Sequence, residues 1–290
     1  MIKACIFDLG GTIVDRYSLI SLLSLKKIFL NRQMTLTNNI LSKGIGMNRQ
    51  EHILNILNDK TISKQWLERY NDYPDEYDVK VLFNACCAHE IQYEHSEKMI
   101  DILPETRECI DYLGFNYIKT GCTTDFSKEN MELIQNKLEL HDIYLDSYVS
   151  SECLNKPIQT TTPVTWPYNS ATLTTETWKR QNRPSRPHPF MIQENMNLLG
   201  ISNPKEVMKI DDTAIGIDEG KNAGCITVGV ARWSIHMNIM NISDAYEFDE
   251  TYPDIQDKLK HSRNVLREAG ADYVIDTLDE LPGVIEGIHY

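Results

Sequence analysis

The chain has 290 residues, of which 41% are hydrophobic and 24% are charged, and its formal net charge is −13. This length allows one large α/β domain and a smaller second domain, with an ample hydrophobic core. The acidic balance excludes the broad basic surface by which proteins bind nucleic acids or anionic membranes, and is compatible with a local basic pocket for an anion.

Several features of the whole chain favour a cytoplasmic protein. No apolar run approaches 18 residues, so no membrane span is predicted. Lys3 and Asp8 interrupt the apolar start that a signal peptide would need. The seven cysteines are scattered and form no CxxC pair, a pattern typical of small core side chains in a reducing compartment.

The first third of the chain predicts one strand followed only by helices. Residues Ile2–Leu9 form an apolar run, which predicts a short central strand, and Gly10, Gly11 and Thr12 predict a tight turn. Helical patterns follow at Leu19–Leu30, Asn48–Asn58, Thr61–Tyr70 and Pro74–Ile100. We therefore predict that residues 17–100 form an α-helical domain inserted after the first strand.

From Pro104 onward, helices alternate with strands. Helices are predicted near Glu105–Leu113, Lys128–Leu138, Pro189–Leu199, Ala214–Asn222, Pro253–Glu268 and up to Ile288, and strands at Asn116–Thr123, Ser147–Ser151, Glu206–Ile210, Cys225–Val230 and Ala271–Ile275. This alternation predicts an α/β core with a parallel sheet, made of residues 1–16 and 101–290. Functional sites in such sheets lie at the carboxyl ends of the strands.

Residues 152–185 differ from the rest of the predicted core. They are rich in Thr, Pro, Asn and Trp and show no clear period. A stretch of this length without secondary structure is unusual inside a compact domain. We interpret it as an irregular insert, either a surface loop or a basic, aromatic lid over the site.

Polar side chains gather where the predicted strands end, or just before the helix that leads into one: Asp8, Thr123, Thr124, Arg186, Asp211 and Asp212. Carboxylates that converge on one edge of a sheet repel each other unless a cation lies between them. Carboxylate oxygens suit Mg²⁺, while Thr and Arg side chains can bind phosphoryl oxygens. An Asp nucleophile would then form an acyl-phosphate that water hydrolyses.

Four motifs carry these residues: FDLGGTIVD from Phe7, GCTTDFSKENM from Gly121, SRPHPFM from Ser185 and KIDDTAIGIDEGKNAGCITVGV from Lys209. In order and spacing they resemble the haloacid dehalogenase superfamily, most closely its phosphonoacetaldehyde hydrolase branch, which the stretch Arg263–Leu281 also resembles. The resemblance implies a Rossmann-like core with a C1-type helical cap.

The resemblance also implies roles for individual residues. Asp8 would be the nucleophile, and Thr124 and Arg186 would act on the phosphoryl group, with Gly10, Gly11 and Thr123 beside it. Mg²⁺ would be held by Asp8, Asp212, the Gly10 carbonyl and Asp211. In the cap, the segment Gly44–Ile53 resembles the one that carries the branch's Schiff-base lysine, and His52 matches one of its histidines.

Three departures from the family pattern matter, of which the second, a small residue at Gly10, is shared with the phosphonate branch. Arg49 stands at the lysine position, and an arginine stays protonated and cannot form an imine. Gly10 stands where the superfamily's phosphatases carry a general acid and base, a group that contributes about 10²–10⁴ in rate. Gly216 stands where the branch often has a second Asp, so Asp211 is expected to take over that role.

These departures leave several interpretations open. Arg49 is either a solvated side chain or a bidentate grip for a substrate carboxylate or phosphonate. His52 is either the missing proton donor or a structural histidine, and Lys43 is the alternative imine-forming amine. The glycines around Gly216 fit no nucleotide-binding loop, which favours close helix packing.

We therefore predict a Mg²⁺-dependent hydrolase of a small phosphorylated or phosphonate substrate. The alternatives are a genuine phosphonoacetaldehyde hydrolase that uses another amine, and a non-catalytic protein that binds such a ligand. A dehalogenase is disfavoured because it needs no metal. A homodimer through the cap is expected, since the apolar stretch Leu19–Leu30 could pack against a partner.

Overall fold

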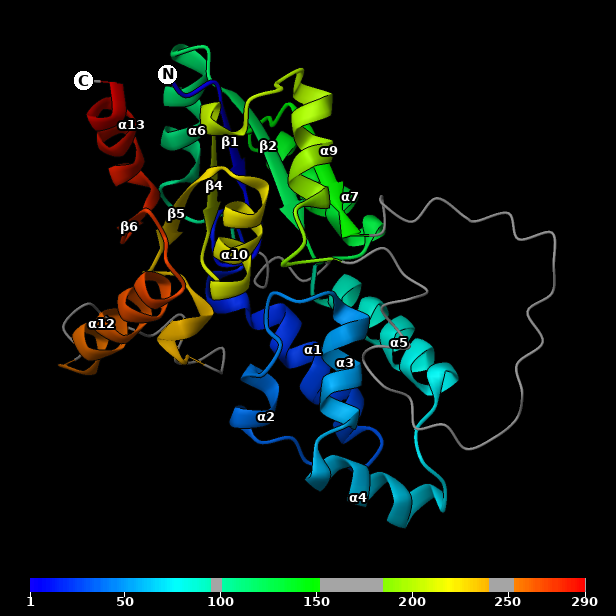
Figure 1. Ribbon diagram of the computed structural model, residues 1–290. Coiled ribbons are helices and arrows are strands. Elements are labelled where there is room, and N and C mark those ends of the chain that lie inside the picture. The colour runs from blue at the N-terminus through cyan, green and yellow to red at the C-terminus, as the bar shows by residue number, and fades with distance from the viewer. Residues whose placement is uncertain (95–100, 152–184, 240–252, 290) are drawn as a thin grey trace, which may run out of the picture.

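The computed structural model describes residues 1–94, 101–151, 185–239 and 253–289. Within these ranges it has one six-stranded parallel sheet in the order β3-β2-β1-β4-β5-β6 (Figure 1). The strands are β1 (Ala4–Phe7), β2 (Lys119–Thr124), β3 (Ser147–Ser150), β4 (Val207–Asp211), β5 (Ile226–Val230) and β6 (Tyr273–Ile275). The predicted α/β core with a parallel sheet is confirmed. The predicted irregular insert falls outside the described residues except for Ser185.

Helices cover both faces of the sheet, as the alternation of side chains along β1 requires. Cys5 and Phe7 of β1 point to the face covered by α6 (Thr106–Phe115), α7 (Lys128–Leu140) and α13 (Leu281–His289). Ala4 and Ile6 point to the other face, against α9 (Phe190–Leu199). α10 (Ala214–Ala223) and α12 (Pro253–Glu268) complete that layer.

A second group of helices lies beyond the carboxyl ends of the strands (Figure 1). It consists of α1 (Leu19–Leu30), α2 (Asn38–Ser42), α3 (Arg49–Leu57), α4 (Lys60–Tyr70) and α5 (Glu76–Glu94). These helices bury a hydrophobic cluster of their own, to which Leu25, Ile53 and Trp66 belong. We call this group of helices the cap.

Two details of the cap differ from the sequence-based expectations or bear on them. The short helix α2 was not predicted, and α5 is described only to Glu94. Most apolar side chains of α1 lie in the interior of this chain, as Leu22, Leu25, Ile28 and Phe29 do. The apolar character of α1 is therefore explained without a partner, and the homodimer stays a prediction.

The chain enters the cap through a tightly bent segment. Asp15, Tyr17 and Ser18 all adopt left-handed backbone conformations with φ between 51° and 63°. The Asp15 carboxylate accepts hydrogen bonds from the backbone N–H of Ile20 at 3.2 and 3.3 Å, which fixes the start of α1. Arg16 pairs with Asp101, near the point where the chain returns to the core. This crossing places the cap over the end of β1.

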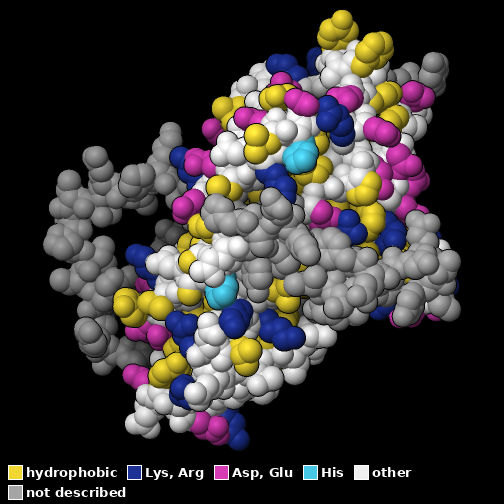
Figure 2. All heavy atoms as spheres, turned by 180° about the vertical axis from the view of Figure 1, so that it is seen from behind, with side chains coloured by type: hydrophobic (Ala, Val, Ile, Leu, Met, Phe, Trp, Pro, Cys, Tyr) yellow, Lys and Arg dark blue, Asp and Glu magenta, His cyan; other side chains and the backbone are white. Residues whose placement is uncertain are grey.

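The surface gives two further findings. Acidic and basic side chains are interspersed over the face seen in Figure 2. Among the helices of the described ranges, none has both the length and the apolar character that crossing a lipid bilayer requires.

Candidate active site

The three central strands bring the predicted carboxylates together. β1 lies between β2 and β4, so that Asp8, which follows β1, lies beside Asp211, the last residue of β4, and its neighbour Asp212. All three side chains are buried, and each offers a carboxylate oxygen within 4.8 Å of the others. The sequence therefore located this cluster correctly from the strand ends alone.

Arg186 joins the cluster from the loop before α9. Its Nη2 donates to Asp8 Oδ1 at 2.7 Å and to the Thr123 carbonyl at 2.9 Å, and lies 3.7 Å from Asp211 Oδ2. Its Nε donates to Glu219 Oε2 at 3.0 Å. The side chain is completely buried, so this guanidinium is a fixed positive charge beside Asp8.

Two residues of the cluster were missed by the sequence analysis. Lys209, on β4, lies with its Nζ 2.9 Å from Asp211 Oδ2 and donates to Thr123 Oγ1 at 2.7 Å. Glu219, on α10, pairs with Arg186 and lies 3.8 Å from Lys209. A charged residue inside the apolar run of β4 was the available signal for Lys209. Glu219 had none, because polar residues are ordinary in a helix.

The carboxylates of this cluster could hold a divalent cation. With all four ionised, Asp8, Asp211, Asp212 and Glu219 would face two cationic side chains and give a formal net charge of −2. Burial raises the pKa of Asp8 to about 7, although Arg186 lowers it. Burial and the neighbouring Asp8 raise the pKa of Asp212 well above its usual range. Asp212 Oδ1 is buried without a hydrogen-bond partner. This donor set fits Mg²⁺, which prefers carboxylate oxygens.

Two glycines make room for these carboxylates. A Cβ on Gly11, whose φ is +74°, would lie 2.4 Å from Asp212 Oδ2. A Cβ on Gly216 would lie 1.9 Å from Asp211 Oδ2. The Asp211 carboxylate thus occupies the space that a side chain at position 216 would need. This arrangement supports the interpretation that Asp211 replaces an Asp at that position.

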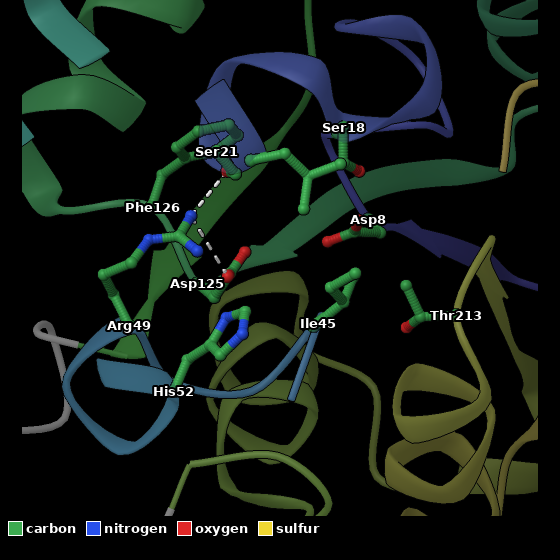
Figure 3. A pocket seen from close by; sticks show the side chains of 12 residues that line it. Asp8, Ser18, Ser21, Ile45, Arg49, His52, Asp125, Phe126 and Thr213 are labelled. Atoms are coloured by element: carbon green, nitrogen blue, oxygen red, sulfur yellow. Dashed lines mark hydrogen bonds and ion pairs between the residues drawn. The ribbon is translucent and has the colours of Figure 1, made fainter. Parts of the chain in front are cut away.

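A small cavity of about 20 Å³ separates Asp8 from the cap (Figure 3). Asp8, Arg49 and Asp125 line it from three different segments, and His52, Phe126 and Thr213 also line it. Its volume is close to that of a single water molecule. The space between Asp8 and the cap is therefore narrow in this structure.

Arg49 is buried in the cavity wall and is not solvated. Its Nη2 lies 3.1 Å from Glu90 Oε1 and 3.6 Å from Asp125 Oδ2, and donates to Ser21 Oγ. Although burial lowers the pKa of Arg49, Glu90 and Asp125 raise it above its ordinary value. The interpretation of Arg49 as a solvated surface residue is therefore wrong, and its substrate-binding role stays a prediction.

His52 lines the same cavity as an uncharged ring. Its Nε2 lies 2.9 Å from the Leu41 carbonyl, and its Nδ1 is buried without a partner. Burial and the neighbouring Arg49 lower the pKa of His52 to about 3. A ring with this pKa is neutral near pH 7 and is therefore a poor general acid. The structure thus gives His52 a position near Asp8 and a charge state that disfavours the role of proton donor.

The remaining predicted residues occupy different places. Gly10 lines the cavity, whereas Thr123, Thr124 and Gly11 are not among the residues that line it. Thr124 Oγ1 accepts a hydrogen bond from the Phe126 backbone N–H at 3.2 Å. Lys43 is exposed, and within the described ranges no lysine lines this cavity.

Comparisons with known proteins agree with this geometry. Residues 2–224 match the haloacid dehalogenase-like hydrolase family. A phosphonoacetaldehyde hydrolase of Bacillus cytotoxicus is 27% identical over 99% of this chain and 96% of its own length. The corresponding protein of Latilactobacillus sakei is 25% identical over 98% of this chain and 95% of its own. The resemblance found in the motifs is confirmed.

Solved structures show the same fold. A phosphonoacetaldehyde hydrolase-like protein from Oleispira antarctica superposes with a TM-score of 0.81 and 23% identity, over 99% of this chain and 92% of that one. A β-phosphoglucomutase from Clostridium difficile superposes with a TM-score of 0.56 and 18% identity, over 90% of this chain and 98% of that one.

Proposed function

The chain belongs to the haloacid dehalogenase-like hydrolases, and we propose that it hydrolyses a small phosphorylated or phosphonate metabolite through an aspartyl-phosphate on Asp8. One observation carries the proposal. Asp8 Oδ1 is held by Arg186 at 2.7 Å, while the Asp8 side chain lines the cavity beneath the cap. The carboxylate is thus fixed at one oxygen and directed at the place where a substrate must lie.

The proposed reaction has two steps. The second oxygen of Asp8 attacks phosphorus, so that an O–P bond forms, and the leaving group departs with the bonding electron pair and takes a proton from solvent. Water then attacks phosphorus and gives up a proton to solvent, the bond to Asp8 breaks, and phosphate is released. Arg186, whose Nη1 is buried without a hydrogen-bond partner among the described residues, is the proposed group that stabilises the charge on the phosphoryl oxygens. Thr124 is the proposed hydroxyl partner of the same group.

Magnesium is the proposed cofactor of this site. Asp8, Asp212 and the Gly10 carbonyl would hold the ion, with Asp211 beside them. When bound, Mg²⁺ supplies positive charge that stabilises the transferring phosphoryl group. Lys209 and Arg186 lower the pKa of Asp211 against the effect of burial, which keeps this carboxylate ionised beside the ion.

Phosphonoacetaldehyde hydrolysis is the second candidate, because the full-length relatives carry that name. Arg49 at the lysine position and the absence of a lysine from the described cavity wall argue against an imine. Borohydride trapping with phosphonoacetaldehyde as substrate decides between the two. Inactivation by borohydride that depends on the substrate would establish the imine route and overturn our preference.

The proposed function is tested with a panel of phosphomonoesters and phosphonates in the presence of Mg²⁺. We expect phosphate release that falls by a factor of about 10⁴ or more in Asp8→Asn, because this change removes the nucleophile and little else. Asp111→Asn, at an exposed position, is the matched control and should keep full activity. Binding of these compounds without turnover would favour the non-catalytic alternative, and turnover that survives Asp8→Asn would refute the nucleophile.

A further inference from the structure

A second charge cluster lies on the cap side of the cavity, and we call its members Arg49, Glu90 and Asp125 the Arg49 cluster. Arg49 comes from α3, Glu90 from α5, and Asp125 from the loop after β2. Both carboxylates share one nitrogen of the guanidinium, at 3.1 and 3.6 Å. Figure 3 shows Arg49 and Asp125 in contact beside the cavity, with Asp8 on its other side.

The positive charge of Arg49 is more than balanced by its partners. Two carboxylates against one guanidinium leave this cluster with a net charge of −1. The side chains of Arg49 and Glu90 are 4% and 1% exposed, so water screens their interaction little. Glu90 is also fixed by Asn130 of α7, whose Nδ2 donates to Glu90 Oε2 at 2.7 Å. The charge of the guanidinium is therefore already balanced by Glu90 and Asp125 at Nη2, although its Nε has no hydrogen-bond partner in the part of the chain that the structure describes.

Asp125 adds negative charge where the substrate must extend. Its side chain is 14% exposed and lines the cavity with Asp8. The two carboxylates repel, and Asp125 is one of the groups that raise the pKa of Asp8. His52, the other titratable cap residue at the cavity, carries no compensating charge. A carboxylate on the organic part of a substrate would therefore meet a net negative charge here.

We propose that the Arg49 cluster selects substrates whose organic part is uncharged or cationic, and rejects those that carry a second anionic group. The inference rests on the proposed function for the position of the phosphoryl group at Asp8. It reverses the sequence-based interpretation of Arg49 as a grip for a substrate carboxylate. That interpretation treated Arg49 as an unbalanced positive charge, whereas two carboxylates from distant segments already balance it.

A matched series of ligands tests this selection by binding, which does not require turnover. The series is propylphosphonate, 3-phosphonopropionate and 3-aminopropylphosphonate, which differ only in the group at the far end of the chain. Their dissociation constants are measured by titration calorimetry on the full-length protein with Mg²⁺. We expect 3-phosphonopropionate to bind at least about tenfold more weakly than propylphosphonate, and the amine to bind no more weakly than propylphosphonate.

Two variants locate the effect in the cluster. Asp125→Asn and Glu90→Gln each remove one negative charge with little change in shape. In each variant, the dissociation constants of 3-phosphonopropionate and propylphosphonate should therefore differ by less than about threefold. The quantity compared is the ratio of the dissociation constants of 3-phosphonopropionate and propylphosphonate within each variant, since a general disturbance of the cap would weaken all three ligands alike. Asp111→Asn is the control for charge removed far from the site.

Several outcomes would overturn the inference: equal binding of the carboxylate and neutral ligands, an unchanged ratio of their dissociation constants in both variants, or no binding of any of the three. The proposed function fails separately. If the ligands bind in the expected order but no phosphomonoester or phosphonate is turned over, only the hydrolase proposal is lost. If turnover depends on Asp8 but the ligand order is absent, only the selection is lost.

Discussion

The cavity has two sides that are built from similar charges and used differently. On the core side, Arg186 and Lys209 hold Asp8, Asp211 and Glu219 in a fully buried network. On the cap side, Arg49 holds Glu90 and Asp125. With all carboxylates ionised, the core side has a formal net charge of −2, which suits a divalent cation. The cap side has a formal net charge of −1, because two carboxylates balance its one arginine.

We therefore assign the proposed chemistry to the core side of the cavity and the proposed substrate selection to the cap side. The core residues follow the motifs that place the chain in its family, and they carry the proposed chemistry. The cap side carries Arg49, which we predicted to stand at the lysine position of the phosphonoacetaldehyde hydrolase branch. In our proposals, reaction and specificity are carried by two ion-pair networks that meet at one cavity.

The largest expected effect comes from breaking each network at its arginine. Arg186→Met leaves several buried carboxylates without their partner, and we expect it to lower the free energy of unfolding by about 3–5 kcal/mol. Arg49→Met should cost less, because Asp125 reaches the cavity and can be solvated there. Urea unfolding measures both.

The matched control for these variants is Arg263→Met, which breaks a partly exposed pair with Asp276 and should cost at most about 1 kcal/mol. If Arg186→Met and Arg49→Met lowered the free energy of unfolding equally, the two networks would contribute equally to stability. That result would contradict the difference that we expect between them.

A smaller effect is expected on the pH dependence of Mg²⁺ binding at Asp8. The pKa of Asp8 is raised to about 7, so below pH 7 a proton occupies Asp8 and must leave before Mg²⁺ binds. Raising the pH towards 7 therefore strengthens Mg²⁺ binding, by about tenfold per pH unit. Titration calorimetry of Mg²⁺ between pH 5.5 and 8 measures the slope. The slope should be shallower in Asp8→Asn, and an affinity independent of pH would contradict the raised pKa.

The smallest effect is expected on the cap side, at His52. Its pKa is lowered to about 3, so the ring stays neutral from pH 5.5 to 8 and transfers no proton. His52→Gln should therefore lower kcat by less than about tenfold and leave the shape of the pH profile unchanged. A loss of about 10²–10⁴ together with a lost limb of the profile would instead make His52 the general acid.

The sequence predicted the core more fully than the site. Strand and helix periods located all six strands of the described ranges to within a few residues, because strands alternate with clear helical patterns even where a strand such as β2 or β3 is not an apolar run. The short helix α2 was missed since it has only five residues and buries little. Asp8, Asp211 and Asp212 were found together because parallel strands end at one edge.

Pairing between distant segments could not be predicted in the same way. Glu90 and Asp125 lie far from Arg49 along the chain, and nothing in their local sequence marks them as its partners. For the same reason Arg49 was interpreted either as solvated or as a substrate grip. The net charge around a buried arginine depends on which carboxylates lie next to it. Those neighbours are set by tertiary structure and not by local sequence.

The contact between Asp211 and Gly216 has a consequence for how such sites diverge. The carboxylate at position 211 and any side chain at position 216 compete for one volume, since a Cβ at 216 would lie 1.9 Å from Asp211 Oδ2. An acidic residue can therefore move between β4 and α10 only if the other position becomes small at the same time. Restoring an acidic side chain at position 216 would therefore require a smaller residue at position 211.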